Sequence, residues 1–242
     1  MGLPHLHAAA AVFKFAVWIF LFRQGLRLQL FKRYPLEYVF FVISPLLLAL
    51  KLGATYSLGV EAASYAWIFF GSNIPFHLLS LLILFRIYYL PSPPRLAWDL
   101  PLIATLPLFT WAALAEPMHW GYRVSYVVFF FQAVLGLMAT ARLWHFKTVK
   151  LGSNLGGLLF GLSMPAVVQS INQGLAYVSG TVWSYNAFAI VSELTSVALW
   201  GMIAYGMRRY DPPIIERVPK ILKPEEAESR LDRLTQALRR WP

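Results

Sequence analysis

The stretch Val182–Met207 reads VWSYNAFAIVSELTSVALWGMIAYGM, and Glu193 is its only charged residue. About 20 consecutive apolar residues are enough for a helix to cross the hydrocarbon core of a bilayer, so this stretch predicts a membrane helix. A carboxyl group at that depth costs several kcal/mol unless a partner stabilises it. The stretch therefore fixes the class of fold and raises the question of which group accompanies Glu193.

The composition of the whole chain agrees with a membrane protein. Of its 242 residues, 58% are hydrophobic and 13% are charged, whereas an ordinary soluble domain carries roughly 25% charged residues. The net charge of +10 arises from short basic clusters between apolar runs and from the C-terminal tail. That distribution is typical of residues that set membrane topology, and we expect no nucleic-acid binding. The sequence has no cysteine, which excludes disulfides, thiolate metal sites and cysteine nucleophiles.

The chain divides into seven apolar segments, each close to the length that a bilayer demands. The N-terminal segment lacks the basic start and the cleavage site of a signal peptide, so we interpret it as a retained membrane helix. The fourth segment contains Pro101 and Pro107, which membrane helices tolerate when neighbouring groups satisfy the freed carbonyls. We therefore predict an all-α bundle of seven transmembrane helices, spanning Ala8–Gly25, Pro35–Gly53, Ser64–Leu90, Leu96–Ala115, Tyr122–Leu143, Asn154–Ala176 and Val182–Met207.

Basic residues in the connections predict the orientation of these helices. Lysine and arginine in short loops stay on the cytoplasmic side of a membrane. The connections after the first, third, fifth and seventh segments are all basic, whereas the opposite connections carry only Lys51 and Arg123 as basic residues. This alternation places the N-terminus outside and the C-terminus in the cytoplasm of an inner-membrane protein. The residues behind it are Arg23, Arg27, Lys32, Arg33, Arg86, Arg95, Arg142, Lys147, Lys150, Arg208 and Arg209.

The chain separates into a transmembrane domain, residues 1–209, and a polar cytoplasmic tail, residues 210–242. Prolines keep the first part of the tail extended, and an amphipathic helix is expected from Pro224 onward. Leu231, Leu234, Leu238 and Trp241 form one apolar stripe at spacings of three and four. Residues 224–241 therefore predict a helix that lies on the lipid bilayer, docks on the bundle or binds a partner helix, including that of another membrane subunit or a cytoplasmic partner.

Polar side chains inside the apolar segments are the candidate functional residues. With the N-terminus outside, most of them fall in the outer half of the membrane, with His77 and Glu193 nearer the middle. One interpretation is an outward-opening cavity, floored by His77 and Glu193, for a small ligand or a proton; the alternative is a set of hydrogen bonds between helices. A Lys14–Glu193 pair would compensate both charges. The candidate ligand-binding or proton-site residues are Lys14, Asn73, His77, Gln169, Asn172, Asn186 and Glu193.

Several classes of cofactor and enzyme require particular residues, and the sequence shows whether those residues are present. The seventh segment has no lysine to carry a retinal, and His77 is the only histidine deep in a segment, which argues against a pair of haems but leaves one haem with an unusual second ligand open. The glycines of GSNLGGLLFG, residues 152–161, lack the lysine of a phosphate-binding loop and instead predict close helix packing. We find no nucleophile–base pair at a recognisable spacing. We expect no enzymatic activity, no catalytic residues, no metal site and no bound cofactor.

Two stretches carry a resemblance to known proteins. FKRYPLEYVFFV, residues 31–42, leads into the second segment, and YAWIFFGSNIPFHLLSLLILFRIYY, residues 65–89, forms most of the third. With these stretches the chain resembles uncharacterised seven-helix integral membrane proteins common in acidobacterial genomes, a resemblance that brings no known activity. We predict a non-enzymatic multi-pass protein that either senses a small ligand or serves as an accessory subunit of a larger membrane complex. The alternative is a proton-coupled transporter or channel that uses Glu193 and His77.

Overall fold

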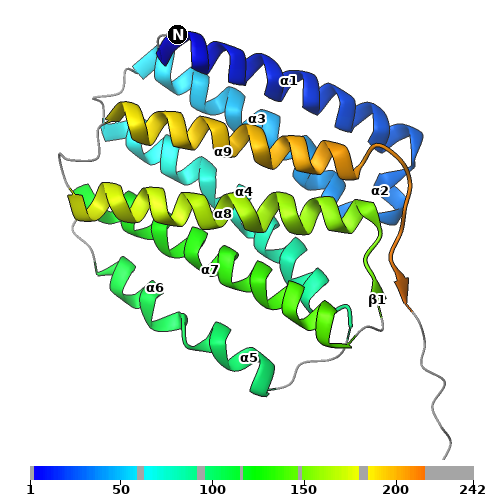
Figure 1. Ribbon diagram of the computed structural model, residues 1–242. Helices are drawn as coiled ribbons and strands as arrows, with labels where there is room; N and C mark the ends of the chain where they lie inside the picture. Colours follow the sequence, from blue (N-terminus) through cyan, green and yellow to red (C-terminus); the bar gives the residue numbers. More distant parts are fainter. Residues whose placement is uncertain are drawn as a thin grey trace, which may run out of the picture.

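The computed structural model describes residues 3–58, 63–91, 96–114, 117–146, 149–179 and 185–215, which are mostly helical (Figure 1). The predicted amphipathic helix at residues 224–241 lies outside this described part of the chain. The described elements are α1 (Leu3–Arg27), α2 (Leu30–Arg33), α3 (Pro35–Leu58), α4 (Ala63–Tyr88), α5 (Leu96–Ile103), α6 (Leu106–Ala113), α7 (Pro117–Phe146), β1 (Val149–Lys150), α8 (Ser153–Ser179), α9 (Tyr185–Gly206) and β2 (Ile214–Ile215).

The described residues of each predicted apolar segment are mostly helical, but the fourth segment is broken into the two short helices α5 and α6. The break at Ala104–Thr105 has a local cause. Proline at position 107 has no backbone N–H, and its ring clashes with the carbonyl of Ile103 in a continuous helix. The hydroxyl of Thr105 donates to the carbonyl of Leu102 at 2.6 Å, which closes the end of α5. The other internal prolines, Pro45, Pro75 and Pro165, are accommodated within α3, α4 and α8.

Within the described residues, five helices are long and apolar enough to cross a membrane, lying in α1, α4, α7, α8 and α9; Asp99–Ala112 is a shorter apolar stretch. Large apolar side chains also face outward along the bundle, as at Val12, Ile19 and Leu46, which are 70%, 70% and 63% exposed. A soluble surface rarely exposes so many large apolar side chains together, whereas lipid covers them without cost. By length and composition, these helices suit a multi-pass membrane protein.

Six of the long helices form a closed ring around the centre of the bundle. Going round it, α1 contacts α3, α3 contacts α4, α4 contacts α7, α7 contacts α8, α8 contacts α9, and α9 returns to α1. Helix α4 also touches α8 across the ring. The α5–α6 pair lies outside the ring and packs on α7, as Figure 1 shows. The centre of the ring is therefore lined by residues from the first, second, third, fifth, sixth and seventh predicted segments.

Glycines bring α8 and α9 into close contact. A Cβ atom added at Gly157 would lie 2.7 Å from the Cα atom of Gly206, and one at Gly161 would lie 2.8 Å from the Ile203 side chain. Side chains at these positions would force the two backbones apart. The prediction of close helix packing from the glycine spacing is confirmed for Gly157 and Gly161, whereas a Cβ at Gly156 would meet nothing within 4 Å.

The described basic residues of the connections after the first, third, fifth and seventh predicted segments gather at one end of the bundle, where α1, α4, α7 and α9 finish and α3, α5 and α8 begin (Figure 1). We call this the basic end. Several contacts hold it together. Arg86 bonds both carboxylate oxygens of the buried Glu37 at 2.8 and 2.9 Å, and Arg142 lies 3.6 Å from Asp99. Strand β1 pairs antiparallel with β2, which anchors the chain that leaves α9.

Candidate functional site

A cavity of about 190 Å³ lies inside the ring of helices, and all six ring helices contribute to its wall. The contributing residues follow helical spacing: on α3 they are i, i+3, i+4 and i+7, so one face of the helix is turned inward. The same pattern recurs on α8. The lining residues are Lys14, Trp18, Ser44, Leu47, Leu48, Lys51, Ser72, Asn73, Phe76, Phe129, Gln132, Leu162, Pro165, Ala166, Gln169, Thr195, Ser196, Leu199 and Trp200.

Glu193 forms an ion pair with Lys14. The Nζ atom of Lys14 lies 2.8 Å from the Oε2 atom of Glu193, and their side chains are 10% and 20% exposed. Helix α1 packs on α9, which places the two groups on facing surfaces. This is the charge compensation that the sequence analysis considered. Because Lys14 also lines the cavity, the pair lies beside the cavity although Glu193 is outside its wall.

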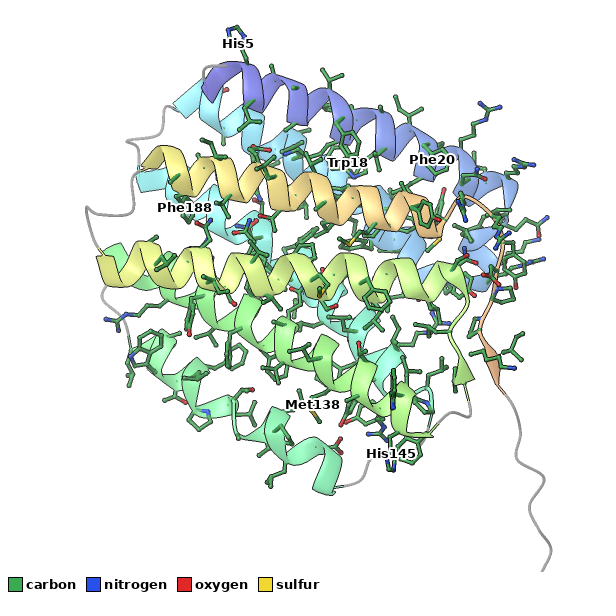
Figure 2. The ribbon with its side chains drawn as sticks, in the orientation of Figure 1. His5, Trp18, Phe20, Met138, His145 and Phe188 are labelled. Carbon is green, nitrogen blue, oxygen red and sulfur yellow. The ribbon has the colours of Figure 1, made fainter. Side chains whose placement is uncertain are left out.

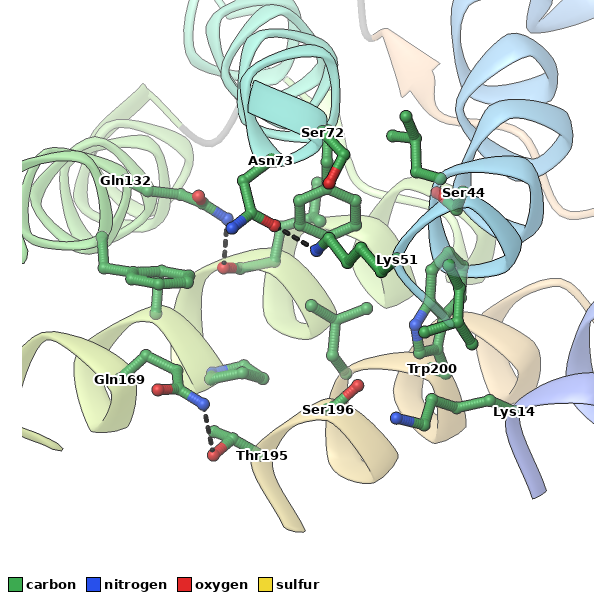
Figure 3. A pocket seen from close by; sticks show the side chains of 18 of the residues that line it. Lys14, Ser44, Lys51, Ser72, Asn73, Gln132, Gln169, Thr195, Ser196 and Trp200 are labelled. Atoms are coloured by element: carbon green, nitrogen blue, oxygen red, sulfur yellow. Dashed lines mark hydrogen bonds between the residues drawn. The ribbon is translucent and has the colours of Figure 1, made fainter. Parts of the chain in front are cut away.

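Lys51 is a cavity residue that the sequence analysis assigned to an outer connection. Helix α3 continues to Leu58, past Gly53, so Lys51 lies within the helix. Its ammonium group donates a hydrogen bond to the side-chain oxygen of Asn73 on α4. Figure 3 shows Lys14 and Lys51 reaching the cavity from two neighbouring helices. Counting Lys51 with the outer connection is therefore wrong, because it lies before Gly53, the predicted end of the second segment, and its side chain lines the cavity.

His77 lies one turn beyond Asn73 on α4 but does not line the cavity. Its ring stands edge-on to Phe129 and Phe76, with ring centroids 4.8 and 5.6 Å away. The residue is buried and its side chain interacts with that of Gln132 on α7, although its Nδ1 atom makes no well-aligned hydrogen bond to another described residue. His5 and His145 lie at opposite ends of the bundle (Figure 2). In the described part of the chain, no group of three His, Asp or Glu side chains is arranged to hold a metal ion.

Gln169 and Asn172 join α8 to α9. The amide nitrogen of Gln169 donates to the hydroxyl of Thr195 at 3.0 Å, and that of Asn172 donates to the hydroxyl of Ser192 at 3.1 Å and the carbonyl of Phe188 at 3.2 Å. These contacts match the alternative interpretation of hydrogen bonds between helices. Gln169 both joins the two helices and lines the cavity. Asn186 lies in the first turn of α9, but its side chain is outside the described part of the structure.

Two polar atoms on the cavity residues are buried without partners. The side chain of Gln132 donates through Nε2 to the carbonyl of Leu162 at 2.9 Å, while its Oε1 atom has no partner among the described residues. The indole Nε1 of Trp18 is likewise unpartnered. Trp18 and Gln132 are 6% and 1% exposed. Buried polar groups are normally hydrogen-bonded, so these two atoms are exceptions among the cavity residues that the structure describes.

The structure thus brings together Lys14, Asn73 and Gln169 of the predicted site, places Glu193 beside them, and leaves His77 and Asn172 outside the cavity wall. Sequence reasoning did not include Lys51, Gln132 and Trp18 in the site. One signal was available for Lys51, which follows Ser44 by seven residues and so shares its helix face. Gln132 was marked as a polar residue inside the fifth segment, although it was not included in the predicted site. No comparable signal marks Trp18, because aromatic residues are common throughout the apolar segments.

Comparisons of the chain with protein-family models, with curated proteins and with solved structures gave no match.

Proposed function

We propose that this chain is a seven-span inner-membrane protein that binds a small ligand in its central cavity and acts as a non-enzymatic sensor of that ligand. The observation that carries this proposal is the cavity itself, which all six ring helices build and which holds two buried, unpartnered polar atoms. Ligand pockets in helix bundles combine apolar walls with a few polar groups that fix orientation. Here Phe76, Phe129 and Trp200 supply apolar wall, and Lys14 and Lys51 supply charge.

The proposed orientation has the N-terminus outside and the C-terminus in the cytoplasm. Its support is the basic end, since positively charged residues stay on the cytoplasmic side. In the same orientation, α3 and the α5–α6 pair complete the seven spans. The resemblance to seven-helix proteins of unknown activity stays a prediction alongside this proposal.

The orientation can be tested by single-cysteine labelling, because the sequence has no cysteine of its own. His5 and Lys150 are both exposed and polar, and they lie on opposite ends of the bundle. A membrane-impermeant maleimide should label His5→Cys in intact cells and Lys150→Cys only after the membrane is opened. The reverse labelling pattern would show that the proposed orientation is inverted. Labelling of both cysteines in intact cells would place both positions outside and so contradict the odd number of spans proposed between them.

The sensor interpretation is favoured over transport by the cavity wall. Transport would be supported by a path lined by Glu193 and His77, but the described lining contains neither residue. Glu193 is engaged by Lys14, and His77 packs between aromatic rings. The accessory-subunit alternative shares the same fold and would use the outward-facing apolar surface instead of the cavity.

The ligand can be sought by purifying the chain in mild detergent and identifying the small molecules and proteins that accompany it by mass spectrometry. A small molecule in near-stoichiometric amount is expected. Ser196→Phe, which fills the cavity from α9, should lose it. Leu194→Phe is the matched control, because Leu194 lies on the same helix and is 54% exposed. A chain that emerges empty from both preparations overturns the sensor proposal, and a fixed protein partner without a small molecule favours the accessory subunit.

A further inference from the structure

A groove of about 430 Å³ lies between α8 and α9, apart from the central cavity. The two helices pack side by side, as Figure 1 shows. The groove shares no lining residue with the central cavity, and three of its side chains, Phe160, Met202 and Tyr205, are 49%, 38% and 64% exposed. The groove therefore opens on the outside of the ring. Most of its lining residues belong to the stretches of α8 and α9 that are long and apolar enough to cross a membrane.

Glycines form this groove. A Cβ atom at Gly157 would lie 2.7 Å from the Cα atom of Gly206, so the two backbones meet there. A Cβ atom at the neighbouring Gly156 would meet nothing within 4 Å, so the space beside it is open. Phe160 on α8 and Tyr205 on α9 line the same groove. In a bilayer, such an apolar groove is filled by an alkyl chain, which gains van der Waals contacts without removing a polar group from water.

A cation lies beside the groove at the basic end. The guanidinium of Arg208 stacks on the ring of Tyr205, with its Cζ atom 4.1 Å from the ring centroid. Arg208 is exposed and makes no ion pair with a described residue. The nearby carboxylate of Asp211 instead accepts a hydrogen bond from the backbone N–H of Ser153 at 2.8 Å. The stacking on Tyr205 therefore holds the guanidinium at the groove and leaves its N–H donors available.

The groove and the cation together match the two parts of a phospholipid. Its alkyl chains suit the apolar groove, and its phosphate accepts hydrogen bonds from a guanidinium. Arg209 and Lys150 are also exposed at the basic end, which favours a headgroup with a net negative charge over a zwitterionic one. We infer that the α8–α9 groove binds an anionic phospholipid, with one alkyl chain beside Gly156 and its phosphate on Arg208.

A second copy of this chain suits the groove less well than a lipid does. Two copies with the same orientation in a membrane pack around an axis normal to it, so the same residues meet at the same depth. Arg208 and Arg209 of one copy would then lie at the level of the same residues of the other, and like charges repel. A lipid phosphate brings the opposite charge to this position.

The unaltered full chain tests the inference directly. The protein is purified in mild detergent, freed of bound lipid and titrated with phosphatidylglycerol, which is anionic, or with phosphatidylcholine, which is zwitterionic and carries the same alkyl chains. Native mass spectrometry counts the lipids that remain on each chain. One phosphatidylglycerol should bind about tenfold more tightly than phosphatidylcholine, because the choline cation offsets the charge of the phosphate beside the basic residues.

A first variant tests the headgroup contact. Arg208→Gln removes the guanidinium and should weaken phosphatidylglycerol binding about tenfold, because a hydrogen bond between charged groups is lost. Lys32→Gln is the matched control. It also removes an exposed positive charge at the basic end, but it lies on α2, which packs on α1 and α3. This control should leave the binding of both lipids unchanged.

A second variant tests the groove itself. Gly156→Leu places a side chain in the open space and should remove the bound lipid, whichever headgroup it carries. Gly53→Leu on α3 is the matched control, because a Cβ atom at Gly53 also meets nothing within 4 Å and this residue does not line the groove. Should Gly156→Leu fail to fold, the comparison of the two lipids and the Arg208→Gln variant still decide the question.

Equal binding of the two lipids overturns the inference, as does phosphatidylglycerol binding that is unchanged in Arg208→Gln or in Gly156→Leu. A dimer that Gly156→Leu abolishes while lipid binding persists would also overturn it and would assign the groove to a second copy. The inference needs α8 and α9 to cross a membrane but needs no ligand in the central cavity. Ser196→Phe, which fills that cavity, should therefore keep its phosphatidylglycerol, so the sensor proposal and this inference can fail separately.

Discussion

Amide side chains lie both in the α8–α9 contact and in the wall of the central cavity, but their hydrogen bonding differs. In the α8–α9 contact, the amide nitrogens of Asn154 and Asn172 donate to backbone carbonyls and to a hydroxyl at 2.7 to 3.2 Å. In the cavity, Gln132 satisfies its nitrogen but leaves its oxygen unpartnered. The difference shows that residue type alone does not separate a structural amide from a binding amide. What separates them is whether every atom of the group finds a partner inside the protein.

The largest effect is expected from breaking the ion pair beside the cavity. Glu193→Ala leaves the Lys14 ammonium without its carboxylate in a buried position, which costs about 3 kcal/mol or more. The Tm of the purified protein should fall sharply, whereas Leu194→Ala, next to it on the outward face, should change little. The double variant Lys14→Met with Glu193→Leu should recover most of the loss. A double variant no more stable than Glu193→Ala would show that the two charges are not coupled.

The next effect tests the α8–α9 contact. Gly157→Ala places a Cβ atom 2.7 Å from the Cα atom of Gly206, and a backbone atom cannot rotate away as a side chain can. We expect a loss of about 1 to 3 kcal/mol in the free energy of unfolding. Gly156→Ala is the matched control, because its Cβ would meet nothing within 4 Å, and better helix propensity should stabilise it by up to about 1 kcal/mol. Opposite signs for adjacent glycines in thermal unfolding would confirm the packing; equal signs would contradict it.

The smallest effect concerns the end of the α8–α9 contact, where the carboxylate of Asp211 accepts a hydrogen bond from the backbone N–H of Ser153 at 2.8 Å. This bond is the main cause that holds the pKa of Asp211 below its usual value of about 4. A lowered pKa contributes stability that is present above the unfolded-state value and is lost as the pH falls through the folded-state value. Below about pH 4, the Tm of the unaltered protein should therefore fall slightly more than the Tm of Asp211→Asn, which has no carboxylate to protonate at this position. Identical profiles for the two proteins would show that the bond adds no pH-dependent stability.

Much of the helical architecture could be predicted from the sequence, because hydropathy depends on each segment alone. The ends of the segments were less predictable. Gly53 marked a plausible end for the second segment, yet α3 runs on to Leu58. Lys51, which precedes Gly53 and was counted with the outer connection, lines the cavity instead. Pro107 made the break between α5 and α6 predictable only in part, because a proline inside a membrane helix often produces only a kink.

The candidate site could be predicted only in part from the sequence. Its members depend on helix rotation and on the order of helices around the ring, which no single segment determines. Lys14 and Glu193 were considered as a pair on the basis of charge, and the contact between α1 and α9 brings them together. The unpartnered atoms of Trp18 and Gln132 could not be predicted, because a lack of partners is a property of the assembled bundle.

The contacts of the basic end also bear on how the proposed ligand would enter and leave the cavity. Glu37 with Arg86, Asn154 with the chain after α9, and β1 with β2 tie successive helices together at that end. These contacts restrain the helices at the basic end, so we expect helix movements to have their largest amplitude at the other end of the bundle. We expect the proposed ligand to enter and leave the cavity from the end of the bundle at which α1 begins.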